Sequence, residues 1–263
     1  MPVAGALAQS VPSLSFGVLN QQSPVATAER WNPILAYAGL KAGVQLELRM
    51  GATVQRTNAM MGRGEFDFVY TNHNFQTEFE RIGYSVIARW AGDPIRGLVV
   101  VRASSKRRTL ADLHGLPVAF PSADAFVAYA VPIMALQQAG ATVREVFAGN
   151  QEGALAQLAA DRVEAAAVNS RFLAEYRRRR PLEARVMYES EPYPELAVIV
   201  HPRVPAAIAT RVRDALVGMT DDPAAAPTLA RAIDRFRVRN RRGIRQSAAG
   251  LQGDRTIKTR WQP

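Results

Sequence analysis

The sequence has no cysteine, which excludes disulfide bonds, thiolate metal sites and cysteine nucleophiles. Histidine is scarce: the three in the chain are scattered and lack a nearby Asp/Glu cluster, so we expect no metal site. Only three lysines occur, and all lie in segments that we expect to be exposed. No apolar run approaches the ~20 residues that a membrane-spanning helix needs.

Patterns typical of catalysis are missing as well. The chain shows no Ser/His/Asp set, no paired carboxylates and no lysine that a cleft would place beside a substrate. The glycine-rich phosphate loop GxGxxG is also absent. We therefore expect a protein that is not an enzyme and uses no cofactor, with no catalytic and no metal-binding residue.

The two ends of the chain differ in composition from the rest. Residues 237–263 hold eight Arg or Lys against one Asp, which accounts for most of the net charge of +10. They lack a helical apolar period and carry few aromatics, so we expect the basic tail, 241–263, to be loosely ordered and to bind no nucleic acid. Residues 1–8 end in Ala-Leu-Ala, which indicates a signal-peptide remnant or, equally, a disordered N-terminus.

One unit occurs twice in the chain, about a hundred residues apart. The copies run from Leu46 to Asn72 and from Arg144 to Ser170. Each has a short apolar strand followed by Gly, then a helix, then an apolar strand that ends in Asn. An acidic residue precedes that Asn by five positions in both copies, namely Asp67 before Asn72 and Glu164 before Asn169.

The repeat predicts two similar α/β lobes. Ligands of such sheets bind beyond the carboxyl ends of the strands, near helix N-termini. Asn72 and Asn169 would then face each other across a cleft between the lobes. Strands and helices alternate in the remaining sequence too, and Ser23 followed by Pro24 marks the start of a helix. The fold class is therefore α/β with mixed sheets.

Several phrases of the sequence resemble one family of binding proteins. They are FGVL, GEFDFVY, GDPIRGLVVVRASS, TLADLHGLPVAF, VFAGNQEGAL and DRVEAAAV, in this order between Leu14 and Met219. Together they are similar to the PhnD-like phosphate/phosphite/phosphonate solute-binding proteins of ABC transporters. That resemblance implies the type II periplasmic binding protein fold, in which two Rossmann-like lobes joined by two hinge strands close on a ligand.

The resemblance also implies how the chain divides. The hinge strands would be Val99–Arg102 and Ala197–His201. Lobe one would comprise residues 9–100 plus 200–240, and lobe two residues 101–199. The implied location is the periplasm and the implied partner an ABC permease, with a membrane sensor kinase as the alternative. We expect a monomer. An enzyme on the same two-lobe fold is the less favoured class.

The family pattern changes where the ligand would bind. Family members carry GDPGSTSGYLVP after the strand that ends in AF, and this sequence reads PSADAFVAYAVP. Ala125, Phe126 and Val127 therefore replace three hydroxyl residues that would cradle an oxyanion. Gln151 replaces the usual His, and Asn169 replaces an Asp. The resemblance thus keeps the scaffold but not the anion-binding groups.

These substitutions favour a neutral polar or zwitterionic ligand over a phosphonate. An apolar part of the ligand would rest on Phe126 or Tyr70. Asp124 would repel an anion or simply cap a helix, and Arg96 would pair either with a ligand carboxylate or with Asp93. The predicted ligand-binding residues are Gln21, Gln22, Tyr70, Asn72, His73, Asp124, Ala125, Phe126, Gln151 and Asn169.

Overall fold

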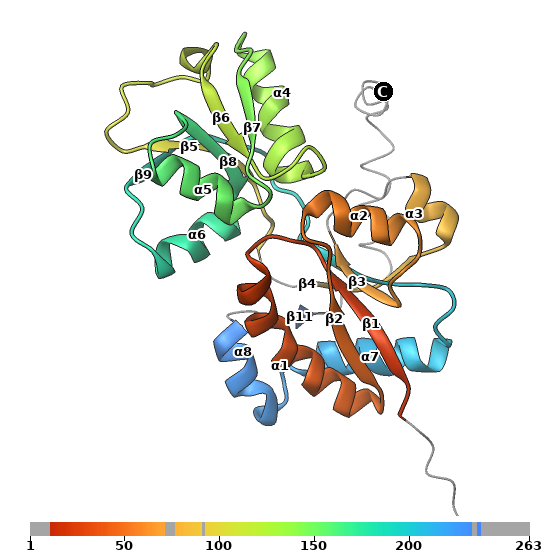
Figure 1. Ribbon diagram of the computed structural model, residues 1–263. Coiled ribbons are helices and arrows are strands. Elements are labelled where there is room, and N and C mark those ends of the chain that lie inside the picture. Colours follow the sequence, from red (N-terminus) through yellow and green to blue (C-terminus); the bar gives the residue numbers. More distant parts are fainter. Residues whose placement is uncertain (1–10, 72–76, 91–92, 233–235, 238–263) are drawn as a thin grey trace, which may run out of the picture.

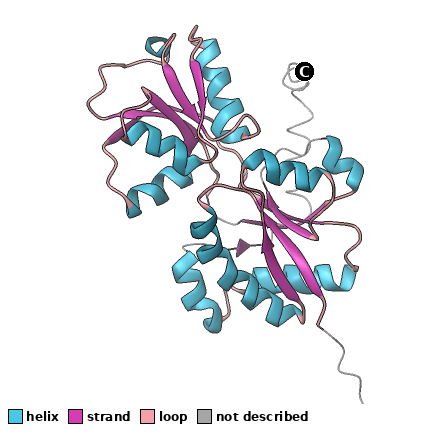
Figure 2. Ribbon diagram, in the orientation of Figure 1, coloured by secondary structure: helices cyan, strands magenta, loops and turns pink. Residues whose placement is uncertain are grey.

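A computed structural model describes residues 11–71, 77–90, 93–232 and 236–237 of the chain. These residues form two lobes, each a mixed β-sheet with helices on both faces (Figure 1, Figure 2). The α/β class and the two-lobe architecture predicted from the sequence are confirmed. The predicted N-terminal segment 1–8 and the basic tail 241–263 lie outside the described residues.

Lobe one is built on a six-stranded sheet. Its strand order is β11 (Phe236–Arg237), β4 (Ser85–Trp90), β10 (Ala197–Val200), β3 (Phe68–Thr71), β1 (Ser13–Val18) and β2 (Gln45–Arg49). Strand β1 runs parallel to both β2 and β3, whereas β10 runs antiparallel to β3 and β4. The helices are α1 (Pro24–Ala42), α2 (Val54–Gly62), α3 (Thr77–Ile82), α7 (Ala206–Gly218), η3 (Pro223–Ala225) and α8 (Ala226–Ala232).

Lobe two is built on a five-stranded sheet. Its strand order is β7 (Arg144–Phe147), β6 (Pro117–Phe120), β8 (Ala165–Asn169), β5 (Gly97–Arg102) and β9 (Ala184–Glu189). Strand β6 is parallel to β7 and β8, and β5 is antiparallel to β8 and β9. The helices are η1 (Ala111–Leu113), the π-helical turn η2 (Phe126–Ala130), α4 (Val131–Gln138), α5 (Gln151–Ala159) and α6 (Ser170–Arg179).

The two lobes repeat one topology, as the sequence repeat predicts. The unit β2–α2–β3 of lobe one corresponds to β7–α5–β8 of lobe two, each flanking a central parallel strand. The predicted acidic pair is equivalent as well. The backbone N–H of Asp67 donates to Ser15 on β1, and that of Glu164 donates to Pro117 on β6.

The predicted positions of the two hinge strands are wrong. Val99–Arg102 belongs to β5, which pairs with two other strands of lobe two, and Ala197–Val200 is β10 of the lobe-one sheet. The chain crosses between the lobes before each of these strands, and the crossings meet in a β-bridge between Ile95 and Tyr193. A fully buried GLVVV run is typical of a central strand, but its composition does not say to which sheet it belongs.

Each sheet is covered on both faces by apolar side chains. In lobe one, α1 and α7 pack on one face and α2 and α3 on the other, while Phe16 and Phe68 are fully buried in the sheet (Figure 1). Helix α1 begins as predicted: Ser23 accepts a hydrogen bond from the Ala26 N–H, and Pro24 occupies the first turn. Among the described residues, no helix is both long and apolar enough to cross a bilayer.

Candidate functional site

A pocket lies between the lobes, beyond the carboxyl ends of β1, β6 and β8. It holds about 440 Å³ of space that is partly open to solvent. Lobe one, lobe two and both crossings all contribute to its lining. No charged side chain is among the described residues that line it, which are Leu19, Asn20, Gln21, Val54, Ile95, Pro121, Ala125, Phe126, Val127, Ala128, Gln151, Asn169 and Leu196.

Two amides of lobe two are held in place where they line this pocket. Asn169 ends β8 and caps α6, because its Oδ1 accepts the Phe172 N–H at 2.7 Å. Gln151 opens α5, and its Oε1 accepts the Asn169 N–H, also at 2.7 Å. Both residues are buried, with 4% and 6% of their surface exposed. The β8–α6 and β7–α5 junctions are therefore tied to each other at the pocket.

Asn20 of lobe one occupies the pocket wall in a different way. Its amide nitrogen donates to the Gly51 carbonyl at 2.8 Å, and its Oδ1 accepts from the Thr57 hydroxyl at 2.5 Å. The same Thr57 hydroxyl accepts the Gly51 N–H at 2.9 Å. Both groups of the Asn20 amide are thus used to fix the β2–α2 loop.

The loop after β6 carries the three residues that replace the family's hydroxyls. Helix η2 starts after Ala125, which offers no side-chain cap, and Ala125, Phe126 and Val127 all line the pocket. The Phe126 ring meets Tyr193 edge to face, with 5.1 Å between centroids. This wall of the pocket is therefore apolar, apart from its backbone groups.

The lobes also contact each other around the pocket. Asp124 does not line it: its carboxylate accepts from the Asn58 amide of α2 at 3.2 Å. Glu152 of α5 accepts the Ser23 N–H of lobe one at 3.3 Å and pairs with Arg180 at 3.3 Å. These contacts link α2 to the loop before η2 and the start of α1 to α5, which indicates that the lobes lie close together.

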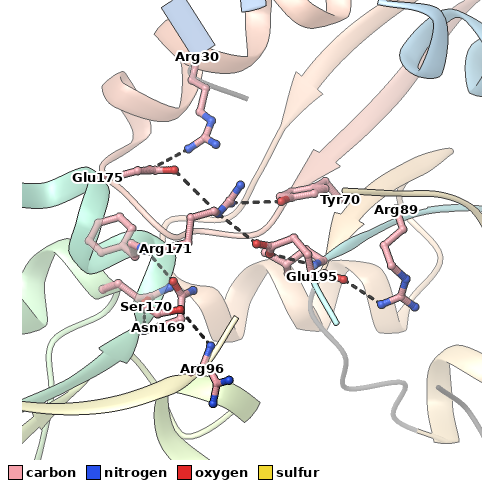
Figure 3. A network of polar contacts seen from close by, with 12 residues as sticks. Arg30, Tyr70, Arg89, Arg96, Asn169, Ser170, Arg171, Glu175 and Glu195 are labelled. Carbon is pink, nitrogen blue, oxygen red and sulfur yellow. Dashed lines mark hydrogen bonds and ion pairs between the residues drawn. The ribbon is translucent and has the colours of Figure 1, made fainter. Parts of the chain in front are cut away.

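A buried network of charges joins the lobes on one flank of the cleft (Figure 3). Arg171 of α6 lies 3.1 Å from the Glu195 carboxylate on the second crossing, and it donates to the Tyr70 hydroxyl of β3 at 3.4 Å. Glu175, one turn further along α6, pairs with Arg30 of α1 at 3.3 Å. Two arginines and two glutamates from both lobes and a crossing thus neutralise each other in the interior.

Burial shapes the acidity of the groups in this network. Glu195 is 2% exposed, and burial raises the pKa of its carboxyl although Arg171 opposes that effect. Burial also raises the pKa of Tyr70 to about 12. The Tyr70 hydroxyl is therefore neutral at pH 7 and acts as an acceptor for Arg171 rather than as a charged group.

A second, smaller pocket, with about 260 Å³ of space that is partly open to solvent, lies beside this network. Gln22 and Tyr70 line it together with Arg30 and Trp31, and it shares Leu19 and Gln21 with the larger pocket. The Arg30 side chain is 13% exposed and pairs with Glu175 at 3.3 Å. This pocket therefore extends the cleft toward α1 and ends at an arginine that is already paired.

The predicted site residues thus divide into several groups. Gln21, Ala125, Phe126, Gln151 and Asn169 line the larger pocket, and Gln22 and Tyr70 line the smaller one. Asp124 is on the cleft rim, and Asn72 and His73 lie outside the described residues.

Arg96 is not placed as a counter-ion for a ligand. It pairs with Glu189 at 3.2 Å and donates to the Ser190 carbonyl at 2.8 Å, so neither of the two predicted roles applies. The residues that sequence reasoning missed are Asn20 and the apolar lining. Asn20 belongs to the same loop as Gln21, but Ile95 and Leu196 carried no signal because the crossings were misplaced.

Comparison with known proteins agrees with this architecture. A family model described as "ABC transporter, phosphonate, periplasmic substrate-binding protein" matches residues 16–238. No curated protein matches the sequence.

Solved structures share the fold at low sequence identity. A binding protein component of an ABC phosphonate transporter from Pseudomonas aeruginosa has a TM-score of 0.80 at 16% identity, covering 92% of this chain and 87% of its own. PhnD1 from Prochlorococcus marinus, in complex with methylphosphonate, has a TM-score of 0.78 at 14% identity, with 91% and 98% covered. XAC2383 from Xanthomonas citri, bound to a chloride ion, has a TM-score of 0.74 at 20% identity, with 94% and 99% covered.

Proposed function

The chain belongs to the phosphonate family of periplasmic substrate-binding proteins of ABC transporters, and from that premise we propose that its ligand is a small, weakly charged polar molecule rather than a phosphonate. The protein captures this ligand between its lobes and presents it to a permease. The family supports neither the sensor-kinase partner nor the enzyme considered from the sequence.

The uncharged lining of the larger pocket carries this proposal. A phosphonate dianion that leaves water needs several charge-assisted donors in return. The described lining supplies amides and apolar side chains, with Ala125, Phe126 and Val127 at the positions where the family resemblance implies hydroxyls. Methylphosphonate is bound by the Prochlorococcus relative, but these replacements argue against the same ligand here.

Capture by closure fits the contacts across the cleft. In two-lobe binding proteins the lobes rotate about their crossings and enclose the ligand. Residues from both lobes and both crossings line the larger pocket. A ligand there would therefore contact both lobes and the segments about which they rotate. A permease that recognises both lobes would then distinguish the closed, loaded protein from the open one.

Thermal-shift and calorimetric titrations of the purified protein test this function. One panel contains phosphate and methylphosphonate, and the other contains small carboxylates, amides and zwitterions. A bound ligand at a hundred times its Kd raises the free energy of unfolding by about 2.7 kcal/mol. We expect stabilisation by members of the second panel only; stabilisation by phosphonates alone would contradict the proposed ligand class.

A pocket-filling variant tests the location. Ala125 is half-buried and lines the larger pocket, so Ala125→Trp should abolish ligand binding while the fold is kept. Ala111→Trp places the same ring on an exposed position of η1 in the same lobe and serves as the control. Equal affinity in both variants would show that the ligand does not bind in this cleft.

A further inference from the structure

The hydrogen bonds of Gln151 and Asn169 fix which end of each amide faces the ligand. A backbone N–H is only a donor, so the partner of the Asn169 N–H must be the oxygen of Gln151, and the partner of the Phe172 N–H must be the oxygen of Asn169. Neither side chain can be flipped without placing two donors face to face. Both NH2 groups are therefore turned away from the protein's own donors.

These two NH2 groups have no hydrogen-bond partner among the described residues. Buried side-chain amides are nearly always satisfied, and those of Gln151 and Asn169 belong to residues that line the larger pocket. The fully buried side-chain nitrogens and oxygens without a partner do not include these two, so each nitrogen keeps some accessible surface. Because both residues line the larger pocket, this surface faces its open space. A ligand acceptor is the group that would complete them.

The other polar side chains that line the larger pocket do not change this preference for a ligand that accepts hydrogen bonds. Both groups of the Asn20 amide are used within lobe one. Gln21 is half-buried, and its amide is the one polar side chain of the described lining that can turn either way. The side chains thus present two fixed donors, one adaptable amide and no carboxylate.

We propose that the polar end of the ligand consists of oxygen acceptors, a carboxylate or a neutral carbonyl on a short apolar body, and that it carries no ammonium group. An ammonium group brings three donors that must all find acceptors when they leave water. Ile95, Leu196 and Phe126 would enclose the apolar body. This inference rests on the proposed function and excludes the zwitterions that the sequence left open.

Two isosteric variants separate the structural role of each amide from its role toward the ligand. Gln151→Glu and Asn169→Asp keep the oxygen that accepts the backbone N–H, and Asp caps a helix as well as Asn does. Each replaces the pocket NH2 by a second oxygen. Asn150→Asp is the matched control, because Asn150 caps α5 through the same bond, to the Gly153 N–H at 2.8 Å, without lining the pocket.

Four probes that share an isopropyl group and differ in their polar group test, by titration calorimetry, which polar group the pocket prefers. The probes are isobutyrate, isobutyramide, isobutylamine and valine. We expect isobutyrate or isobutyramide to bind and isobutylamine and valine to bind at least tenfold more weakly. For the probe that binds, Gln151→Glu and Asn169→Asp should each lower the affinity by roughly tenfold to a hundredfold, and Asn150→Asp should leave it unchanged.

The outcomes distinguish this inference from the function on which it rests. If isobutylamine or valine bound most tightly and Ala125→Trp abolished that binding, the inference that the ligand carries no ammonium group would be wrong. The proposal that the ligand binds in the cleft would stand. Binding of isobutyrate that Gln151→Glu and Asn169→Asp leave intact would also overturn the inference about the polar end of the ligand. Binding that Ala125→Trp leaves intact would overturn the cleft itself, and failure of all four probes at millimolar concentration would overturn the proposed acceptor-bearing body.

Discussion

The two lobes share one order for five strands, but the polar side chains at their cleft-facing ends are bonded differently. In lobe one, the amide of Asn20 is consumed by the Gly51 carbonyl and the Thr57 hydroxyl. In lobe two, Gln151 and Asn169 use only their oxygens within the protein. Lobe one therefore offers an Asn20 amide already bonded within the protein, beside the adaptable amide of Gln21, and lobe two offers two donors that are still open.

The helices that follow the central strands differ in the same sense. Helix α1 of lobe one begins at a Ser23 cap, whereas η2 of lobe two begins after Ala125 with no side-chain cap. A polar residue at the carboxyl end of a strand can therefore serve the scaffold or the ligand. What decides is the number of its hydrogen-bonding groups that the backbone already uses.

The largest expected effect comes from a substitution that breaks the contact between the lobes and leaves the core of each lobe unchanged. Arg171→Met removes the cation that lies between Tyr70, Glu175 and Glu195, and it leaves two buried carboxylates with less compensation. Loss of one partner from a buried ion pair costs about 3–5 kcal/mol. We expect a comparable loss of stability in calorimetry, with the two lobes unfolding in separate steps.

Arg178→Met is the control for this variant, since Arg178 lies on the same helix and is exposed. It should change the free energy of unfolding by less than about 0.5 kcal/mol. Equal melting curves for the two variants would show that the network does not couple the lobes.

The next effect sharpens the contrast between the amides. Asn20→Asp should lower the free energy of unfolding by about 2–3 kcal/mol, because the Gly51 carbonyl loses its donor and faces a buried carboxylate. Asn169→Asp keeps the α6 cap and should cost less than about 0.5 kcal/mol. Urea denaturation measures both losses. Similar values in the two variants would contradict the contrast between the Asn20 amide, which is bonded through both groups, and the Asn169 amide, which is bonded through its oxygen only.

Much of the fold followed from the sequence because the relevant signals are local. Ser23-Pro24 places the start of α1, and the repeat places β2–α2–β3 against β7–α5–β8. The crossings did not follow, because Gly97–Arg102 reads as a buried strand in either lobe. Only its pairing with β8 and β9 assigns it.

Part of the pocket lining was predictable from the sequence, but the hydrogen bonds of its side chains were not. Gln151 and Asn169 were placed near the ligand from the family pattern, and they do line the larger pocket. Which of their atoms is free depends on the Asn169 and Phe172 N–H groups, and that geometry has no sequence signature. Tyr70 was expected to carry part of a ligand, but an arginine from the other lobe contacts its hydroxyl.

The smallest effect concerns the end of lobe one that lies away from the cleft, where Asp67 precedes β3. Burial raises the pKa of Asp67, but hydrogen bonds from Arg203 and Ser15 outweigh it and hold the pKa below the usual value. A lowered folded pKa stabilises the protein above the unfolded value of about 4, and this contribution is lost as the pH falls through the folded pKa. Asp67→Asn should therefore flatten the pH dependence of stability below about pH 4.

Ser15→Ala refines this prediction, because it keeps the Asp67 carboxylate and removes one of its donors. Melting temperatures across an acid series should place this variant between the wild type and Asp67→Asn. Three superimposable acid profiles would mean that Asp67 contributes nothing to acid sensitivity.

The indole of Trp31 lies against the Tyr70 ring, with 4.7 Å between centroids, and the hydroxyl of that ring receives a hydrogen bond from Arg171 of the other lobe. Indole emission shifts with the local electric field and with access of water. Separation of the lobes would withdraw the guanidinium of Arg171 from Tyr70 and wet the smaller pocket that Trp31 lines. Trp31 is thus an intrinsic fluorophore between the two lobes. A shift in the wavelength of its emission maximum would report the separation of the lobes without any label.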